Sequence, residues 1–432
     1  MNKPVALIMA PVATVSGYGA RSRDIAYSLI KSGKYEVKIW NTRWGATPMN
    51  ALDSNNPKHK AIMDCLMTEP QLAKQPELFV QVTVPNEFQR LGMYNIGVTA
   101  GIETTIATAA WIEGCNNMDL VLVSSEHAKT VFEQSVWQKM NQQTNQPEGE
   151  LKLTTKMEVL FEGVDLDVYH QTNEIDKTIV DALKDVKEDF AYLFVGHWMN
   201  GDMGEDRKNV SGLVRTFFEA FKNKAPHNQP ALILKSSASD FSTIDRDMIL
   251  NKIEMIRNMM NTKALPNVYL IHGDLTDGEM NSLYNHPKVK AHVTFTKGEG
   301  YGRPLAEASL SQKPIIAPNW SGHVDFLKEA VLLPGQLTQV HPSVVWENVI
   351  IPESQWFTVD YGYAAGVLRM VFEKYKDYKD LGKKQAFNVK KNFNLVAMDE
   401  KFSYIIDNIV TFPEGPTMNV PTTKKVDTLP TI

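Results

Sequence analysis

The stretch that says most about the fold of this chain is Lys297-Gly298-Glu299-Gly300-Tyr301-Gly302-Arg303-Pro304-Leu305-Ala306-Glu307-Ala308. An apolar run at 291–295, typical of a buried strand, comes directly before it. Pro304 suits the first turn of a helix, so the glycines form a turn between a strand and a helix. Such a turn exposes backbone N–H groups beside the positive end of a helix dipole, and this arrangement suits a diphosphate.

Two glutamates of this stretch are candidate ligand-binding residues. Glu299 lies in the glycine turn, and Glu307 lies about one helical turn beyond Pro304, so both are within reach of the same end of the helix. Ionised carboxylates accept hydrogen bonds from hydroxyl groups. One of the two can therefore contact the hydroxyls of a sugar and the other a ribose.

The quoted stretch belongs to the second of two α/β series. The first series opens with an apolar run at 4–13, a glycine turn at 16–19, a helical pattern and a strand at 35–40. The pattern restarts at 191–195 and alternates strands with helices to about residue 318. Two doubly wound sheets in tandem leave a cleft at the carboxyl ends of their strands, where ligands bind. The sequence therefore predicts two Rossmann-like domains that face a cleft.

The composition argues against some functions and favours one cellular compartment. The 432-residue chain has a net charge of -5, which argues against avid non-specific binding to nucleic acid or to an anionic membrane. Its two cysteines, Cys65 and Cys115, have no metal-ligand partners at useful spacing and read as idle thiols. The apolar run near the N-terminus is too short for a membrane helix. We expect a cytoplasmic protein with no integral membrane segment.

These features resemble the retaining glycosyltransferases of the GT-B architecture, of the group 1 or family 4-like type, whose hallmark is a Glu-x7-Glu motif in the C-terminal domain. Glu299 and Glu307 match that motif. The resemblance covers most of the chain and is weakest over 43–77 and after 412. Further segments that carry it are Arg207-Lys208-Asn209 after Gly196, Phe161-Glu162-Gly163-Val164-Asp165, Ser321-Gly322, Glu103-Thr104-Thr105, Trp111 and Val123-Ser124-Ser125.

The resemblance implies a domain plan. Residues 1–172 form an acceptor domain, residues 173–385 form a nucleotide-sugar donor domain, and residues 386–411 form a crossover helix that packs back on the first domain. The proline-rich tail, 412–432, is expected to be loose.

The resemblance also implies donor-side roles. Glu299 contacts the donor sugar and Glu307 holds the ribose, while Lys208, with Arg207 as a second candidate, neutralises the leaving diphosphate. The loop that begins at His272 faces the nucleobase, largely through its backbone. The other donor-side candidates, which line the sugar and phosphates, are Gly196, His197, Gly300, Tyr301, Gly302 and Arg303.

One donor-side position departs from the family pattern. Many members carry an arginine directly after the glycine that matches Gly196, but here that residue is His197. Arg207 is a candidate for the missing charge. His197 and His272 can equally be read as ordinary loop histidines with internal partners.

On the acceptor side, Gly17, Tyr18 and Gly19 match the family's glycine turn, which lets a ligand approach the backbone closely. Glu87 and Glu103 follow strand ends of the first sheet, so either can orient an acceptor hydroxyl. A tight turn and a buried polar network are the structural alternatives for these positions.

The resemblance implies an activity in which a sugar is transferred, with retention of configuration, from a nucleoside diphosphate to an acceptor hydroxyl. UDP-glucose is the default donor. We expect no cofactor and no catalytic metal, because neither Asp165-x-Asp167 nor Asp245-x-Asp247 follows a buried strand.

Other activities and acceptors stay open. The alternatives are a sugar-nucleotide epimerase or hydrolase of the same fold and an inactive nucleotide-sugar-binding relative, whereas no segment resembles the cofactor lysine site that a phosphorylase needs. The acceptor can be a glycan, a small molecule, a protein or a modified DNA base. The lysine-rich segment 374–391 reads as a solvated helix face, with a patch for a polyanion as the alternative.

Overall fold

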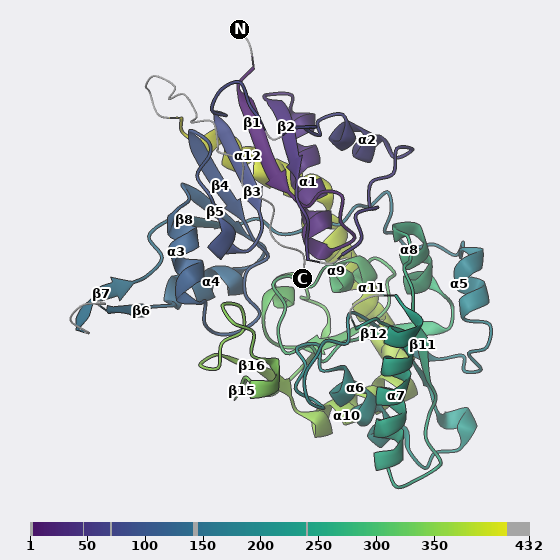
Figure 1. Ribbon diagram of the computed structural model, residues 1–432. Coiled ribbons are helices and arrows are strands. Elements are labelled where there is room, and N and C mark those ends of the chain that lie inside the picture. Colours follow the sequence, from purple (N-terminus) through teal and green to yellow (C-terminus); the bar gives the residue numbers. More distant parts are fainter. Residues whose placement is uncertain (1–2, 46, 70, 141–145, 239–240, 413–432) are drawn as a thin grey trace.

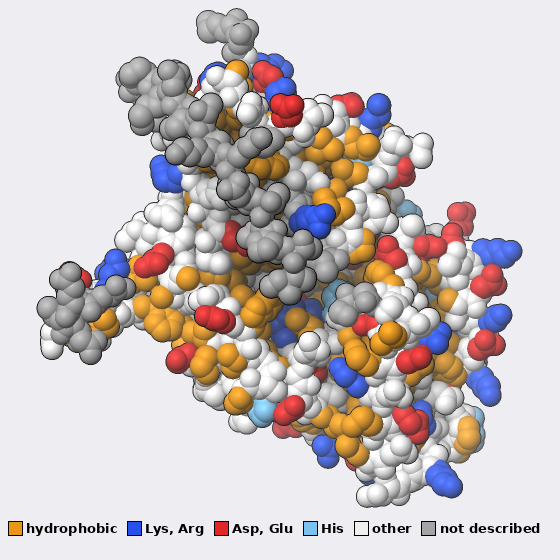
Figure 2. Space-filling view, in the orientation of Figure 1, with side chains coloured by type: hydrophobic (Ala, Val, Ile, Leu, Met, Phe, Trp, Pro, Cys, Tyr) orange, Lys and Arg blue, Asp and Glu red, His pale blue; other side chains and the backbone are white. Residues whose placement is uncertain are grey.

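The structure, a computed structural model, describes residues 3–45, 47–69, 71–140, 146–238 and 241–412, and within them the chain forms two parallel six-stranded sheets. Each sheet belongs to its own α/β domain (Figure 1). The predicted pair of doubly wound Rossmann-like domains is confirmed. Acidic and basic side chains are interspersed over the face shown in Figure 2, and the chain has a small net charge of -5.

The first sheet has the strand order β2-β1-β3-β4-β5-β8, and an isolated parallel bridge between Ile39 and Leu66 lies beyond β2. Its strands are β1 (Val5–Ala10), β2 (Glu36–Asn41), β3 (Leu78–Val82), β4 (Tyr94–Val98), β5 (Leu120–Val123) and β8 (Lys156–Val159). The helices of this domain are α1 (Gly17–Ser32), α2 (Pro57–Met63), α3 (Ala109–Asn116) and α4 (Glu126–Gln134).

The second sheet has the order β11-β10-β9-β12-β13-β14, which is the dinucleotide-binding order with a reversal between β9 and β12. Its strands are β9 (Ala191–Val195), β10 (Ala231–Lys235), β11 (Val268–Ile271), β12 (Val289–Val293), β13 (Ile315–Pro318) and β14 (Val331–Leu333). The helices are α5 (Lys177–Ala182), α6 (Val210–Phe221), α7 (Thr243–Met259), α8 (Asp277–Asn285), α9 (Arg303–Ser309), α10 (Tyr361–Glu373) and α11 (Tyr375–Asn392).

Local sequence explains the main elements. Strand β5 is Leu-Val-Leu-Val, and all four side chains are buried because a parallel sheet is covered on both faces. Helix α1 begins where the Ser16 hydroxyl accepts a hydrogen bond from the Gly19 amide, and it ends at Gly33, whose φ of 65° is left-handed.

Some elements differ from the sequence predictions. Helix α3 begins at Ala109, because the Thr108 hydroxyl caps it by accepting from the Trp111 amide. Two antiparallel hairpins were not predicted: β6 (Trp137–Met140) with β7 (Pro147–Leu151), and β15 (Gly335–Gln339) with β16 (Gln355–Val359). Strands β6, β7 and β15 are short and mostly polar, so they lack the apolar runs that reveal the central strands.

The segment predicted as one crossover helix at 386–411 is the end of α11 and a separate helix, α12 (Leu395–Asn408). The break falls at Asn394, whose side chain caps α12 by accepting from the Ala397 amide. Helix α12 packs on α1 behind the first sheet, and its Met398 and Phe402 share a core with Ile25 (Figure 1).

Two further predictions concern the C-terminal tail and the absence of a membrane-spanning helix. Of the predicted loose tail, residues 413–432 lie outside the described residues. No helix among the residues described above is both long and apolar enough to cross a membrane.

Candidate functional site

The candidate donor site lies where the strand order of the second sheet reverses. Strands β9 and β12 are neighbours, but the chain leaves them towards opposite sides, so a crevice forms at their carboxyl ends. Gly196 follows β9, and the glycine turn with Glu299 follows β12. Lys208, just before α6, reaches the same crevice, so three donor-side candidates that lie far apart in the sequence meet here.

Glu299 is a buried carboxylate held between two cations. Its Oε1 lies 2.5 Å from Nζ of Lys208, and its Oε2 lies 3.4 Å from Nη1 of Arg207. Burial alone would raise the pKa of Glu299, but the two cations outweigh burial and lower it to about 2. Burial lowers the pKa of Lys208, against the opposing effect of Glu299. Glu299 is therefore ionised at neutral pH, and its charge is balanced by Arg207 and Lys208, whose side chains are 16% and 13% exposed.

Arg207 connects this pair to the first domain. Its guanidinium donates to the Gly298 carbonyl at 2.9 Å and lies 3.7 Å from Oε1 of Glu103. Burial opposes its charge, but Glu103 and Glu299 together raise the pKa of Arg207. Glu103, expected on the acceptor side, thus lies opposite the donor residues across the domain boundary.

Glu307 has a different environment. Its Oε1 accepts from Nε of Arg303 at 3.1 Å and its Oε2 accepts from the Tyr284 hydroxyl at 3.3 Å. Burial raises the pKa of Glu307 to about 7, because Arg303 compensates only in part and Asp277 adds negative charge. Arg303 also donates to Oδ2 of Asp24 in the first domain at 2.8 Å.

The glycines of the turn allow the two domains to touch. A Cβ at Gly298 would lie 1.9 Å from the Glu103 carbonyl oxygen, and one at Gly300 would lie 2.6 Å from that of Ala100. Gly302 has a left-handed φ of 97° and precedes α9. Glycine is therefore required here for close packing between domains as well as for the turn.

The Tyr301 side chain points away from the crevice. It is 2% exposed, and its ring centroid lies 4.9 Å from that of Phe326. Its hydroxyl has no hydrogen-bond partner within the described ranges. Only the backbone of Tyr301 is positioned for the donor-side role that the sequence suggested.

The two donor-side histidines have internal partners. Nδ1 of His197 lies 3.0 Å from the Ser237 hydroxyl, and burial together with Lys208 lowers the pKa of His197. Nε2 of His272 lies 2.8 Å from Oδ2 of Asp245. Both side chains thus form contacts within the second domain. The backbone of the loop that starts at His272 lies at the carboxyl end of β11.

The acceptor-side candidates gather at the carboxyl ends of β1, β3 and β4. A Cβ at Gly19 would lie 2.2 Å from the Thr14 carbonyl oxygen, whereas one at Gly17 would meet no atom within 4 Å. The Tyr18 hydroxyl lies 2.9 Å from the Thr99 hydroxyl, and the Glu87 carboxylate accepts a hydrogen bond from the Thr83 hydroxyl. The space beside Gly19 is thus filled by the Thr14 backbone, whereas the space beside Gly17 remains available to a ligand.

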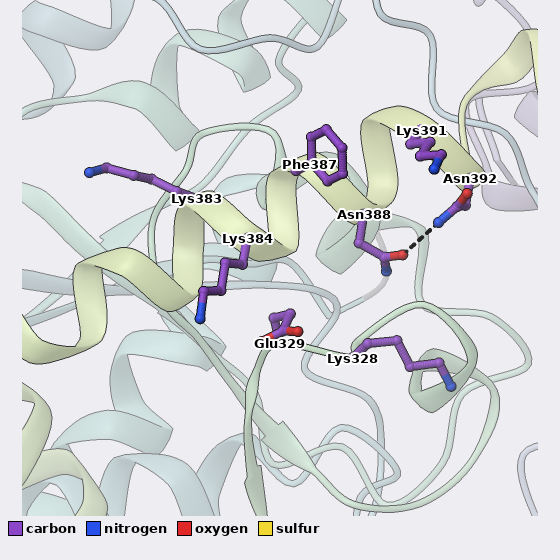
Figure 3. A pocket seen from close by; sticks show the side chains of 8 residues that line it. All are labelled: Lys328, Glu329, Lys383, Lys384, Phe387, Asn388, Lys391 and Asn392. Carbon is purple, nitrogen blue, oxygen red and sulfur yellow. Dashed lines mark hydrogen bonds between the residues drawn. The ribbon is translucent and has the colours of Figure 1, made fainter.

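A small pocket marks the crevice. Its volume is about 20 Å³, and Lys208, Glu299 and Gly302 are among its lining residues. A wider pocket of about 450 Å³ lies elsewhere, against α11, and contains none of the predicted site residues (Figure 3). It is lined by Lys328, Glu329, Lys383, Lys384, Phe387, Asn388, Lys391 and Asn392.

The described residues contain no group of three or more His, Cys, Asp or Glu side chains placed to hold a metal ion. In each of the two Asp-x-Asp segments at 165–167 and 245–247, the first aspartate pairs with another side chain of the protein. Asp165 pairs with Lys58 at 2.5 Å, and Asp245 pairs with His272.

Sequence reasoning missed four residues that complete the two glutamate environments. Asp24 accepts a hydrogen bond from Arg303, and the Tyr284 hydroxyl donates to Glu307. The Ser321 hydroxyl accepts from the Glu299 amide at 3.0 Å. His323, also buried, lies close enough to Glu299 to contribute to the lowering of its pKa, although burial lowers the pKa of His323 as well. No local pattern marks Asp24 or Tyr284. Ser321, however, belongs to a segment that already carried the family resemblance.

No protein-family model and no curated protein matches the chain. Solved structures do match it over nearly its whole length. A glycosyltransferase from Rickettsia africae ESF-5 is 14% identical, with 95% of this chain and 99% of the other covered and a TM-score of 0.60. Sucrose-phosphate synthase from Thermosynechococcus elongatus is 14% identical, with coverage of 94% and 99% and a TM-score of 0.61. HepE from Anabaena, in complex with UDP-glucose, is 12% identical, with coverage of 94% and 99% and a TM-score of 0.58. At these identities the likeness shows the fold, and the chain has the two-domain GT-B architecture.

Proposed function

We propose that the protein is a retaining glycosyltransferase that moves a sugar from a nucleoside diphosphate to an acceptor hydroxyl. UDP-glucose is the first donor to test, since HepE of the same architecture is solved with UDP-glucose. Glu299, Glu307, Lys208 and Arg207 carry the donor-side roles given above. The proposal includes no cofactor, no metal requirement and a cytoplasmic location.

The observation that carries the proposal is the buried pair of Lys208 and Glu299 at the reversal of the second sheet. Glycosyl transfer breaks the bond between the sugar carbon and a phosphate oxygen, so negative charge grows on the departing diphosphate. A buried cation that is already in position stabilises this charge without the cost of reorganising water. The diphosphate competes with Glu299 for Lys208, which frees the carboxylate to accept hydrogen bonds from the sugar hydroxyls.

Glu307 and Arg303 complete the donor side. An ionised Glu307 accepts hydrogen bonds from the ribose hydroxyls, and Arg303 favours this ionised form. In the proposed step the acceptor oxygen bonds to the sugar carbon on the face from which the diphosphate leaves. The proton of the acceptor passes to the leaving phosphate, so the transfer needs no separate base.

The experiment starts with a thermal-shift screen against UDP, GDP, ADP and TDP and their common sugars. Binding to the folded state raises the melting temperature, which identifies the nucleotide. Release of that nucleotide from its sugar is then measured with and without acceptors, because an epimerase or hydrolase needs none. Failure of every nucleotide to shift the melting temperature would contradict the proposal.

A matched pair of variants ties the result to the site. Glu299→Gln should lose transfer, whereas the same change at the exposed Glu353 should leave it intact. Equal transfer by the two variants would remove Glu299 from the reaction.

A further inference from the structure

Two aromatic rings are stacked at the edge of the first sheet that faces the second domain. The ring centroids of Tyr18 and Trp44 are 3.9 Å apart, and their planes are inclined by 19°. Tyr18 is at the start of α1, just after β1, and Trp44 is in the loop after β2. Both therefore lie at the carboxyl ends of neighbouring parallel strands, which is where α/β sheets bind ligands.

The Tyr18 ring of this stack is held in place by hydrogen bonds. The Tyr18 hydroxyl lies 2.9 Å from the Thr99 hydroxyl and accepts from the Ala100 amide at 3.2 Å. Burial raises the pKa of Tyr18 well above its usual value, so the hydroxyl stays neutral. Because the ring cannot turn without breaking these bonds, it forms a rigid base.

The loop that carries Trp44 is also anchored to the first domain. The Val15 amide donates to the Pro48 carbonyl at 2.9 Å, and the Ala51 amide donates to the Ala13 carbonyl at 3.0 Å. Trp44 itself remains partly exposed. The stack is thus preorganised and offers aromatic surface to a ligand, an arrangement that lowers the entropy cost of binding.

The stack is next to the domain boundary at the glycine turn. Ala100, which bonds to Tyr18, is the residue whose carbonyl would contact a Cβ at Gly300. Glu103 acts on the Tyr18 hydroxyl through its charge and also lies 3.7 Å from Arg207. A ligand on the stack is therefore close to the first-domain side of the donor crevice.

The charges around the stack are mixed, because the exposed Arg43 precedes Trp44 in its loop while three carboxylates lie on the same side of the domain. Glu87, Glu103 and Glu162 lie on this side of the first domain, and the last two act on Tyr18 through their charge. Carboxylates repel a phosphate backbone and accept hydrogen bonds from hydroxyl groups. The face of an aromatic ring is negative and attracts weakly positive C–H groups. A sugar ring offers both, with C–H groups on its faces and hydroxyls at its rim.

We propose that Trp44, seated on Tyr18, is the platform on which a carbohydrate acceptor stacks its ring, and this rests on the glycosyltransferase activity proposed above. Trp44 determines which class of acceptor binds, and the neighbouring carboxylates orient its hydroxyls towards the donor. The platform takes no part in breaking the donor bond.

The test measures binding of two disaccharides, maltose and cellobiose, to the UDP-loaded protein by ligand-observed NMR, with a single-stranded oligothymidylate as the polyanion. At least one disaccharide should bind. Trp44→Ala should weaken this binding about tenfold, and Trp44→Phe should keep most of it, because the stacking surface remains. Trp40→Ala, which removes another exposed tryptophan of the same domain, should leave binding unchanged.

Three results would overturn the platform: equal disaccharide binding by Trp44→Ala, binding of neither disaccharide, or binding of the oligothymidylate alone. Failure of UDP to bind is a separate outcome, since it contradicts the proposed donor site. Disaccharide binding that depends on Trp44 would support the platform even in that case.

Discussion

The surroundings of Glu299 and Glu307 differ although the two residues are eight positions apart and equally buried. Glu299 lies beside two cations, Lys208 and Arg207, of which only Arg207 is shared with a second carboxylate, Glu103, and its pKa falls to about 2. Glu307 shares its single cation, Arg303, with Asp24, and its pKa rises to about 7. The number of available cations, rather than the depth of burial, therefore decides the charge of each carboxylate.

The two environments share one feature. Each contains an arginine that also reaches the first domain, from Arg207 to Glu103 and from Arg303 to Asp24. Changes in the charge of either site are therefore linked to contact between the domains. The following predictions change one environment at a time.

The largest effect is expected for Glu299→Gln. Transfer should fall on the order of 1000-fold, because the sugar contact is lost and Lys208 has no carboxylate to position it. The structure also predicts a loss of stability of about 3 kcal/mol, since buried cations lose their partner. Urea unfolding and initial rates of nucleotide release measure the two effects. The double variant Glu299→Gln with Lys208→Met should regain stability without activity, and recovery of activity would contradict the assignment.

Lys208→Met should lower the turnover rate about 100-fold while the affinity for the nucleotide changes less, because the charge on the diphosphate grows during the reaction. The pKa of Glu299 should rise as well, since Lys208 is its main source of positive charge. Steady-state rates across pH 5–9 measure both. A structural Lys208 would instead show a normal rate with a lower melting temperature.

Arg303→Met should weaken nucleotide affinity about tenfold, which corresponds to 1.4 kcal/mol. Without its cation, Glu307 becomes protonated and accepts ribose hydrogen bonds less well. Asp24→Asn provides the matched control, because it removes the nearest carboxylate of the other domain and leaves Arg303 with Glu307 and the more distant Glu162, at 3.8 Å. Asp24→Asn should therefore bind the nucleotide at least as tightly as the parent protein, and calorimetric titration of both variants would detect the opposite order.

The smallest effect is in the pH dependence of stability, and the two glutamates contribute with opposite signs. Between pH 4.5 and about 7 the folded protein holds a proton on Glu307 that the unfolded chain has lost, so the free energy of unfolding falls as pH rises. Below pH 4.5 the unfolded chain takes up a proton that Glu299 resists down to pH 2, so stability falls as pH falls. Glu307→Gln should flatten the first slope only. Unfolding curves at half-unit pH steps provide the measurement, and an unchanged slope in that variant would mean that Glu307 is ionised throughout.

The sequence predicted the two domains well because their signals are local. Apolar runs, glycine turns and helix caps act within a few residues, and the Glu-x7-Glu stretch contains both its glutamates and Arg303. It did not predict what compensates each charge. Asp24 is 279 positions from Arg303, and Tyr284 reaches Glu307 from another helix. Contacts of this kind depend on the packing of the two domains, which no periodicity within one segment encodes.

The chain passes between the domains twice, and the two passages lie side by side. The Val164 amide donates to the Phe393 carbonyl at 2.9 Å, and the Leu395 amide donates to the Val164 carbonyl at 2.8 Å. Because α12 belongs to the core of the first domain, a cut in the loop after residue 165 would leave two fragments that each contain part of that core. The protein is thus suited to fragment complementation, in which residues 1–172 and 173–432 made as separate chains reassemble through α12 and are held without a covalent link at the first passage.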